Sequence, residues 1–154
     1  MLDLEFPETE SIGEDMPSLN HSYLCTQIMR QLLQNPDILP LPELSLDIEN
    51  GLTPDISVYW AKEVQPDFFH DVTRYSHLPI LAIEIISSSQ NIQDLLSKAV
   101  KLIEAGVKNV WTLEPYSRTV FLTNATVRNQ RFHEQLIETD GITVDFKKLF
   151  ESRT

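Results

Sequence analysis

Apolar residues recur at every fourth position near the start of the chain. Leu24, Ile28 and Leu32 form this stripe, and a spacing of about four residues places side chains on one face of an α-helix. Ser18 or Asn20 can serve as the N-cap, because a serine or asparagine oxygen accepts a hydrogen bond from the first helical turn. The pattern predicts a helix with one buried face that begins close to residue 18.

The next apolar residues alternate with polar ones over residues 44–48, which is the period of a half-buried β-strand. Asn50 and Gly51 follow, and this dipeptide favours the tight turn of a β-hairpin. The alternation resumes at Ile56. These patterns predict a hairpin that joins strand 44–48 to the strand starting at Ile56, followed by a loop or short helix over residues 61–77.

The segment LPILAIEII is apolar almost throughout, which predicts a strand covered on both faces. An amphipathic helical stripe runs from Ile92 to Ile103, and Gly106 is well placed to end that helix. The segment NVWTLEP then predicts a strand beside LPILAIEII, reached through a right-handed crossover. The segments SRTVFLT and VRNQRFHEQL predict further antiparallel strands, and GITVDFKKLF predicts a short strand and a short helix.

The order of these elements predicts an α/β fold: a mixed central β-sheet flanked by helices, with additional antiparallel strands toward the C-terminus. The chain has 154 residues, which suits one domain with a substantial core. We expect a loosely structured acidic leader over residues 1–16 and a single domain over residues 17–154.

Composition narrows the function classes. The formal net charge is −11, so a nucleic-acid role needs a local basic cluster or metal ions to offset the acid excess. The single cysteine, Cys25, excludes a disulfide framework and a zinc-finger spacing. The sequence has no apolar run long enough to cross a membrane, and its first residues are acidic where a secretory signal is basic. We therefore expect a cytoplasmic protein without membrane association.

One acid in the apolar strand points to chemistry. Glu84 stands within LAIEII, and a buried carboxylate ordinarily has a partner. Asp55 starts the strand PDISV, and if the two strands are neighbours, both carboxylates face one side and repel each other unless a cation intervenes. Mg²⁺ binds such oxygens together with water and phosphate. The residues also allow a simpler interpretation, in which Asp55 caps a turn and Glu84 pairs with a buried lysine or arginine.

The series PDISV, AIEIISSS, DLLSKAVKLIEAGVKNVWTLEP and RTVFL resembles the Uma-two family of restriction-endonuclease-like proteins, which belongs to the PD-(D/E)XK nuclease superfamily. The likeness spans residues 17–122. It implies a restriction-endonuclease-like core of a helix, a mixed sheet and a second helix. It also implies a site that hydrolyses phosphodiester bonds in DNA with Mg²⁺ or Mn²⁺ as cofactor.

The resemblance assigns roles by position. Asp55 and Glu84 match the two acids and become metal ligands, and the backbone carbonyl of Ile85 completes the set. The superfamily places a lysine two residues after the second acid, where this chain has Ile86. The matching lysine here is Lys98, displaced onto the following helix.

Lys98 would position or deprotonate the attacking water, or balance charge in the transition state. Lys101 is the substitute for this role. The alternative for Lys98 is an ordinary solvent-exposed pair with Asp94, four residues earlier on the helix.

Four further residues are second-tier candidates. Glu43 could reach the metal or a bridging water, or it is a surface acid. His21 could contact a phosphate, or it caps the helix or faces solvent. Ser87 could donate to substrate or orient Glu84, or it caps a loop. Gln27 lies on the polar side of the first helix, where the superfamily sometimes carries an acid.

Three functions remain open at this level. The preferred one is a Mg²⁺-dependent endonuclease that acts on DNA. The second is a catalytically inactive nuclease-fold module that binds protein or nucleic acid, which the acidic charge and the displaced lysine favour. The third is a homo-oligomeric structural or regulatory domain with the C-terminal strands as its interface. A homodimer is also compatible with the first, since endonucleases that cut both strands often act as dimers.

Overall fold

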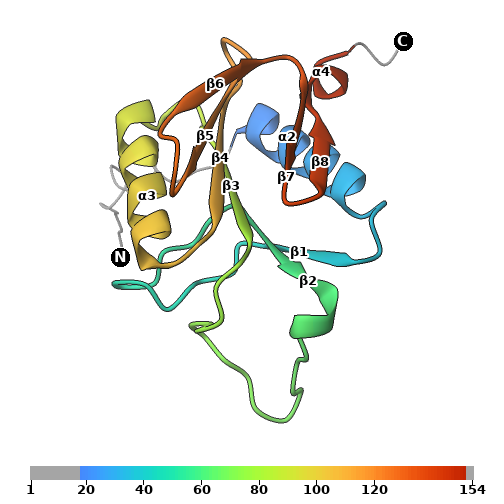
Figure 1. Cartoon of the computed structure of the whole chain (residues 1–154), viewed down its shortest axis with the longest axis vertical. Coiled ribbons are helices and arrows are strands. Elements are labelled where there is room, and N and C mark those ends of the chain that lie inside the picture. Colours follow the sequence, from blue (N-terminus) through green and yellow to red (C-terminus); the bar gives the residue numbers. More distant parts are fainter. Residues whose placement is uncertain (1–17, 152–154) are drawn as a thin grey trace, which may run out of the picture.

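A six-stranded mixed β-sheet, in the order β1-β2-β3-β4-β5-β6, forms the centre of the computed structural model, which describes residues 18–151 (Figure 1). Two further strands, β7 and β8, form a separate antiparallel sheet. The predicted acidic leader lies outside the described residues. In chain order the helices and strands are α2 (Leu19–Leu32), β1 (Ile38–Pro42), β2 (Ile56–Trp60), the 3₁₀ helix η1 (Ala61–Glu63), β3 (Leu81–Ile85), α3 (Ile92–Ala105), β4 (Asn109–Glu114), β5 (Thr119–Asn124), β6 (Gln130–His133), β7 (Leu136–Thr139), β8 (Ile142–Asp145) and α4 (Phe146–Leu149).

Different elements cover the two faces of the large sheet. Helix α2, together with β7, β8 and α4, packs on one face, and α3 packs on the other (Figure 1). Side chains alternate along β3 because successive residues of a strand point to opposite faces. Leu81, Ile83 and Ile85 join the core on the α2 face, whereas Ala82 joins the core on the α3 face. Glu84 shares the alternation of Ala82 and therefore faces α3.

Helix α2 confirms its sequence prediction. Of the two predicted caps, Ser18 is the one used, and its hydroxyl accepts a hydrogen bond from the His21 N–H at 3.1 Å. The predicted stripe of Leu24, Ile28 and Leu32 is buried against the sheet. Burial of this apolar face, rather than helix propensity alone, holds the helix in place.

The predicted first strand of the hairpin is wrong. The strand that pairs with β2 is β1, which aligns Ile38 with Trp60 and Pro42 with Ile56, and the loop that joins them spans residues 43–55. The prolines of β1 concealed it, but β1 is an edge strand, where a missing N–H costs no ladder bond.

The alternation that suggested strand 44–48 comes from loop packing instead. Leu46 and Ile48 are buried in the core beneath α3, and Leu46 forms only an isolated bridge to Tyr75. The expected turn at Gly51 is present, with φ of +97°, but it lies inside the loop.

The β3-α3-β4 unit confirms its prediction. Strands β3 and β4 are parallel neighbours, with Ile83 opposite Trp111, and α3 connects them. The segment 127–136, predicted as one strand, is instead divided between β6 and β7 at Glu134, where φ is +45°. Strand β7 then pairs with β8 rather than with the large sheet. Within residues 18–151, no helix is long and apolar enough to cross a membrane.

We predict that Gly106→Ala lowers the free energy of unfolding by about 1–2 kcal/mol. Gly106 ends α3 with φ of +122°, and an added Cβ would lie 3.0 Å from Leu78 Cδ1. Gly141→Ala is the matched control, because Gly141 has φ of +82° but no atom within 4 Å of an added Cβ. Urea unfolding measures both variants, and an equal or larger loss in Gly141→Ala would contradict the role of Leu78.

Candidate active site

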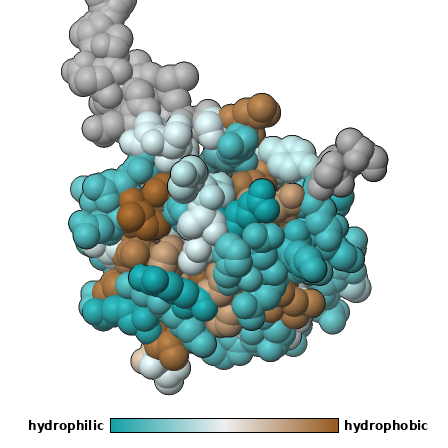
Figure 2. All heavy atoms as spheres, turned by 90° about the horizontal axis from the view of Figure 1, so that it is seen from above, coloured by the Kyte–Doolittle hydropathy of each residue, from teal (hydrophilic) through white to brown (hydrophobic). Residues whose placement is uncertain are grey.

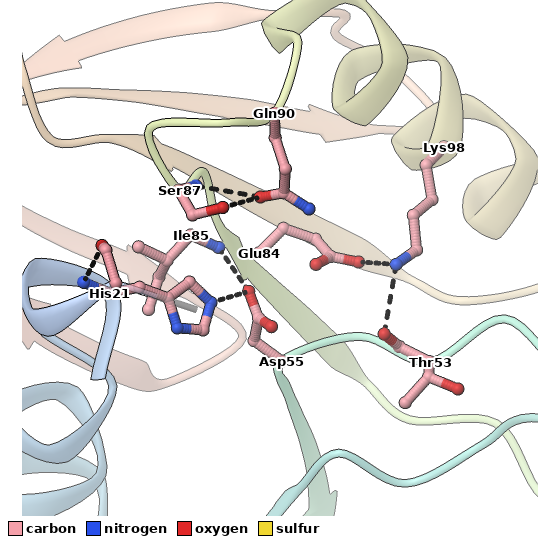
Figure 3. Close-up of polar contacts among 9 residues, drawn as sticks. His21, Thr53, Asp55, Glu84, Ile85, Ser87, Gln90 and Lys98 are labelled. Atoms are coloured by element: carbon pink, nitrogen blue, oxygen red, sulfur yellow. Dashed lines mark hydrogen bonds and ion pairs between the residues drawn. The ribbon is translucent and has the colours of Figure 1, made fainter. Parts of the chain in front are cut away.

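Two carboxylates meet where β2 begins and β3 ends. Strands β2 and β3 are antiparallel, with Ile56 opposite Ile83, so Asp55 at the start of β2 lies beside the last residues of β3. The charge of Asp55 acts on Glu84, and Figure 3 shows both side chains at this end of the strand pair. The predicted neighbourhood of the two strands is therefore confirmed.

Two donors hold one oxygen of Asp55. Its Oδ2 accepts a hydrogen bond from the Ile85 N–H at 2.7 Å and lies 3.1 Å from His21 Nε2 (Figure 3). The Ile85 N–H lies beyond the last paired residue of β2, so the side chain of Asp55 satisfies a donor that the ladder leaves unpaired. The orientation of the Asp55 carboxylate is thus set by both β3 and α2.

Glu84 is buried, with 3% of its surface exposed, and pairs with a lysine from the helix that covers it. Lys98 Nζ lies 2.6 Å from Glu84 Oε2 and also donates a hydrogen bond to the Thr53 carbonyl at 3.1 Å (Figure 3). The distance makes this a charge-assisted contact between a buried carboxylate and an ammonium.

The environment shifts the proton affinity of Glu84. Burial raises the pKa of Glu84 to about 7, and the nearby Asp55 charge acts in the same direction. The charge of Lys98, its hydrogen bond to Glu84 and a backbone hydrogen bond from Asp55 lower this pKa, but they do not outweigh burial. A carboxyl whose proton affinity is this high is a common feature of functional sites.

His21 completes the cluster from α2. Its hydrogen bond to Asp55 raises the pKa of His21 and outweighs burial, and the charges of Asp55, Glu84 and Glu43 add to this rise. His21 is 8% exposed, so the interpretation as a solvent-facing residue is wrong. Its Nδ1 is buried without a hydrogen-bond partner among the described residues.

The two lysine candidates separate clearly. Lys98 reaches Glu84, and within residues 18–151 no ion pair joins it to Asp94, so the simple surface pair is wrong. Lys101 points elsewhere and lies 3.6 Å from Glu49, with both side chains about half exposed. Lys101 is therefore not part of the cluster.

The remaining candidates lie around the cluster with different contacts. Glu43 is exposed, and its N–H donates to the Asp55 carbonyl at 3.0 Å. Ser87 is buried and donates to Gln90 Oε1 from both its N–H and its hydroxyl, which is the loop-capping alternative. Gln27 is half-buried farther along α2, and its side chain has no hydrogen bond to another described residue.

Sequence reasoning missed two residues of the site. Thr53 contributes a backbone carbonyl, and side-chain identity carries no signal for such a contact. Gln90 had a usable signal, since a serine followed three residues later by glutamine is typical of a reciprocal capping arrangement.

The oxygen-rich donor set fits a hard divalent cation. Glu84 offers a buried carboxylate whose Oε2 contacts only the Lys98 ammonium among the described residues, and Asp55 is oriented beside it. The Ile85 carbonyl faces the same strand edge as its N–H, hence toward Asp55, because both groups of one extended residue point to one neighbour. Among the described residues, no group of three or more His, Cys, Asp or Glu side chains could hold a metal by itself. Mg²⁺ suits this set, because it commonly binds one or two carboxylates and completes its shell with water and phosphate.

The surface around this end of the molecule is mixed. Figure 2 views the end at which α3 begins, and hydrophilic residues there surround several separate hydrophobic patches. Lys98 keeps 22% of its side chain exposed, so the cluster is reachable from solvent on its α3 side.

Comparison with known structures supports the fold. A crystal structure described as a "putative nuclease belonging to DUF820", from Anabaena variabilis, matches with a TM-score of 0.74 and 19% identity, covering 88% of this chain and 82% of that chain. A cryo-electron-microscopy structure of a DrdV–DNA complex has a TM-score of 0.40 and 13% identity, covering 71% of this chain and 85% of that chain; this overlap is too low to bear on the fold. A search of curated proteins found no match.

The family comparison covers nearly the whole chain. The model of the Uma2 family, described as "Putative restriction endonuclease", matches residues 3–150. This span includes every residue of the Asp55, Glu84 and Lys98 cluster. The resemblance found in the sequence is thereby confirmed, and the chain belongs to the Uma2 family.

Proposed function

We propose that this protein is a Mg²⁺-dependent endonuclease that hydrolyses phosphodiester bonds in DNA. The observation that carries the proposal is the convergence of Asp55, Glu84 and Lys98 from three separate segments at one end of the sheet. Membership of the Uma2 family, whose description is "Putative restriction endonuclease", supports the nuclease class. Mn²⁺ is expected to substitute for Mg²⁺, because it also prefers oxygen ligands.

The acidic residues would hold the ion. Asp55 and Glu84 would supply carboxylate oxygens, and the Ile85 carbonyl would add a third ligand. When bound, the cation would offset negative charge on the phosphoryl group and make a nearby water more acidic. His21 and the Ile85 N–H keep Asp55 in one orientation, which limits the reorganisation needed for binding.

Lys98 would act on the reacting phosphate or the attacking water. Glu84 and the Thr53 carbonyl fix the position of Lys98 Nζ. The positive charge is therefore held in one place, although the lysine side chain is long. A preorganised donor of this kind stabilises charge that develops in the transition state. Lys98 also supplies positive charge inside a chain whose net charge is −11, which assists the approach of a phosphate.

A second candidate function follows from the same contacts. Each carboxylate already has a cationic or protonatable partner, Lys98 for Glu84 and His21 for Asp55. The cluster is therefore compatible with a nuclease-fold module that binds no metal and does not cleave. Such a module would bind a protein or a nucleic acid through other parts of its surface.

Substitutions in the cluster should separate metal binding from cleavage. Asp55→Ala and Glu84→Ala should abolish both Mn²⁺ binding, measured by calorimetry, and nicking of supercoiled plasmid. Lys98→Ala should keep Mn²⁺ binding but lower the cleavage rate by about 10²–10³-fold, the typical effect of removing one transition-state donor. Lys101→Ala removes a lysine outside the cluster on the same helix and should cleave normally. Full cleavage by the Asp55→Ala/Glu84→Ala double variant would refute the proposal.

Without divalent ions, the stability of the protein should depend on pH. The folded state keeps a proton on Glu84 up to a pKa of about 7, whereas the unfolded chain releases it near its ordinary pKa of about 4.5. Stability should therefore fall by about 3 kcal/mol as pH rises from about 4.5 to about 7. His21 acts in the same direction, because its raised pKa stabilises the fold at low pH and this contribution is lost as pH rises through the folded pKa.

Urea unfolding across this pH range in EDTA measures the fall. Glu84→Gln should remove the contribution of Glu84 to the pH dependence of the unfolding free energy and leave the contribution of His21. Saturating Mg²⁺ should also flatten this pH dependence, because a bound cation favours the ionised carboxylates. If Mg²⁺ leaves the curve unchanged and Asp55→Asn raises the melting temperature, the two acids merely repel each other and the module without metal is the correct function.

A further inference from the structure

A short turn before α3 holds one amide in a fixed orientation. Gln90 Oε1 accepts hydrogen bonds from the Ser87 N–H at 2.9 Å and from the Ser87 hydroxyl at 3.1 Å. The Gln90 N–H in turn donates to the Ser87 carbonyl at 3.0 Å, which closes the turn. A backbone N–H can only donate, so the oxygen of the Gln90 amide must face Ser87 and the nitrogen must face away from it.

The amide nitrogen of Gln90 is directed at the candidate active site. Figure 3 shows it turned away from Ser87 and toward the space beside the Glu84 carboxylate and the Lys98 ammonium. Among the residues that the structure describes, none accepts a hydrogen bond from this nitrogen. Gln90 is exposed, so a ligand can reach its two donor hydrogens.

The chemistry of this position suits an anion. An amide nitrogen donates and does not accept, so its complement is an oxygen with free lone pairs. The amide is neutral, so it can bind an anion without forming an ion pair with Glu84 or Asp55. The ligand expected beside the two acids and Lys98 is a phosphate group, whose oxygens are strong acceptors.

We propose that Gln90 contacts the substrate: its Nε2 donates a hydrogen bond to a non-bridging oxygen of the phosphodiester bound beside Glu84 and Lys98. This inference rests on the proposed nuclease function and extends its set of substrate-binding residues. The alternative role for Gln90 is structural, as the acceptor that closes the Ser87 turn. The two roles use different ends of the amide, so substitutions can separate them.

Two variants of Gln90 give opposite results under the two roles. Gln90→Glu keeps an oxygen for Ser87 but replaces the donor with a negative charge, whereas Gln90→Met keeps the length of the side chain and removes both ends. If Gln90 contacts phosphate, both variants weaken binding by about ten- to a hundred-fold, the effect of losing one hydrogen bond to a charged group, and Gln90→Glu is the weaker binder. If Gln90 only closes the turn, Gln90→Glu binds normally and Gln90→Met is the impaired variant.

The experiment measures the anisotropy of a fluorescein-labelled DNA duplex titrated with the whole chain, with Ca²⁺ in place of Mg²⁺ so that cleavage does not interfere. Gln93→Glu is the matched control, because it adds the same charge at an exposed position on the first turn of α3 and should change the Kd by no more than about two-fold. Equal weakening by Gln93→Glu and Gln90→Glu would overturn the proposal, since general repulsion then explains the loss. A wild-type chain that neither binds nor cleaves DNA would refute the nuclease function itself, whereas normal binding by Gln90→Glu refutes only the role of Gln90.

Discussion

The buried pair between Glu84 and Lys98 constrains the rest of this structure. A carboxylate in the middle of a sheet loses most of its hydration, and removing the cation that pairs with it typically costs about 3–5 kcal/mol. Strand β3 is covered on both faces, so the cation must come from a covering element. Lys98 meets this requirement because α3 docks with Leu95, Ala99 and Leu102 against the sheet, which leaves the adjacent position 98 beside the strand end.

The second constraint is the orientation of Asp55. Its carboxylate completes the hydrogen bonding of β3 at Ile85 and also contacts His21, so three elements meet at one side chain. The antiparallel pairing of β2 with β3 brings Asp55 and Glu84 together, although the segment 61–80 separates their strands in the chain. The fold thus brings two acids together at a place where positive charge is needed to offset their repulsion. Compensation by Lys98 and by His21, and in the proposed function by a divalent ion, connects the stability of the fold to the proposed chemistry.

Much of this arrangement follows from periodicity. The stripe at Leu24, Ile28 and Leu32 predicted α2, and the apolar segment around Glu84 predicted a central strand joined to β4 by a helix. The neighbourhood of Asp55 and Glu84 also followed once the strands were placed. The first strand could not be predicted in this way. The prolines of β1 are atypical of a strand, and the buried loop residues after it alternate with polar ones as strand residues do.

The contacts that give the site its character depend on tertiary docking. No local pattern reveals that Lys98 turns toward Glu84 or that His21 turns toward Asp55, since both depend on how two helices sit against the sheet. The same limit applies to the Thr53 carbonyl, whose role is independent of side-chain type. The most direct measurement is anomalous diffraction from a crystal soaked in Mn²⁺. A peak coordinated by oxygens of both Asp55 and Glu84 is the expected result, and a soaked crystal without such a peak would contradict a metal-dependent site.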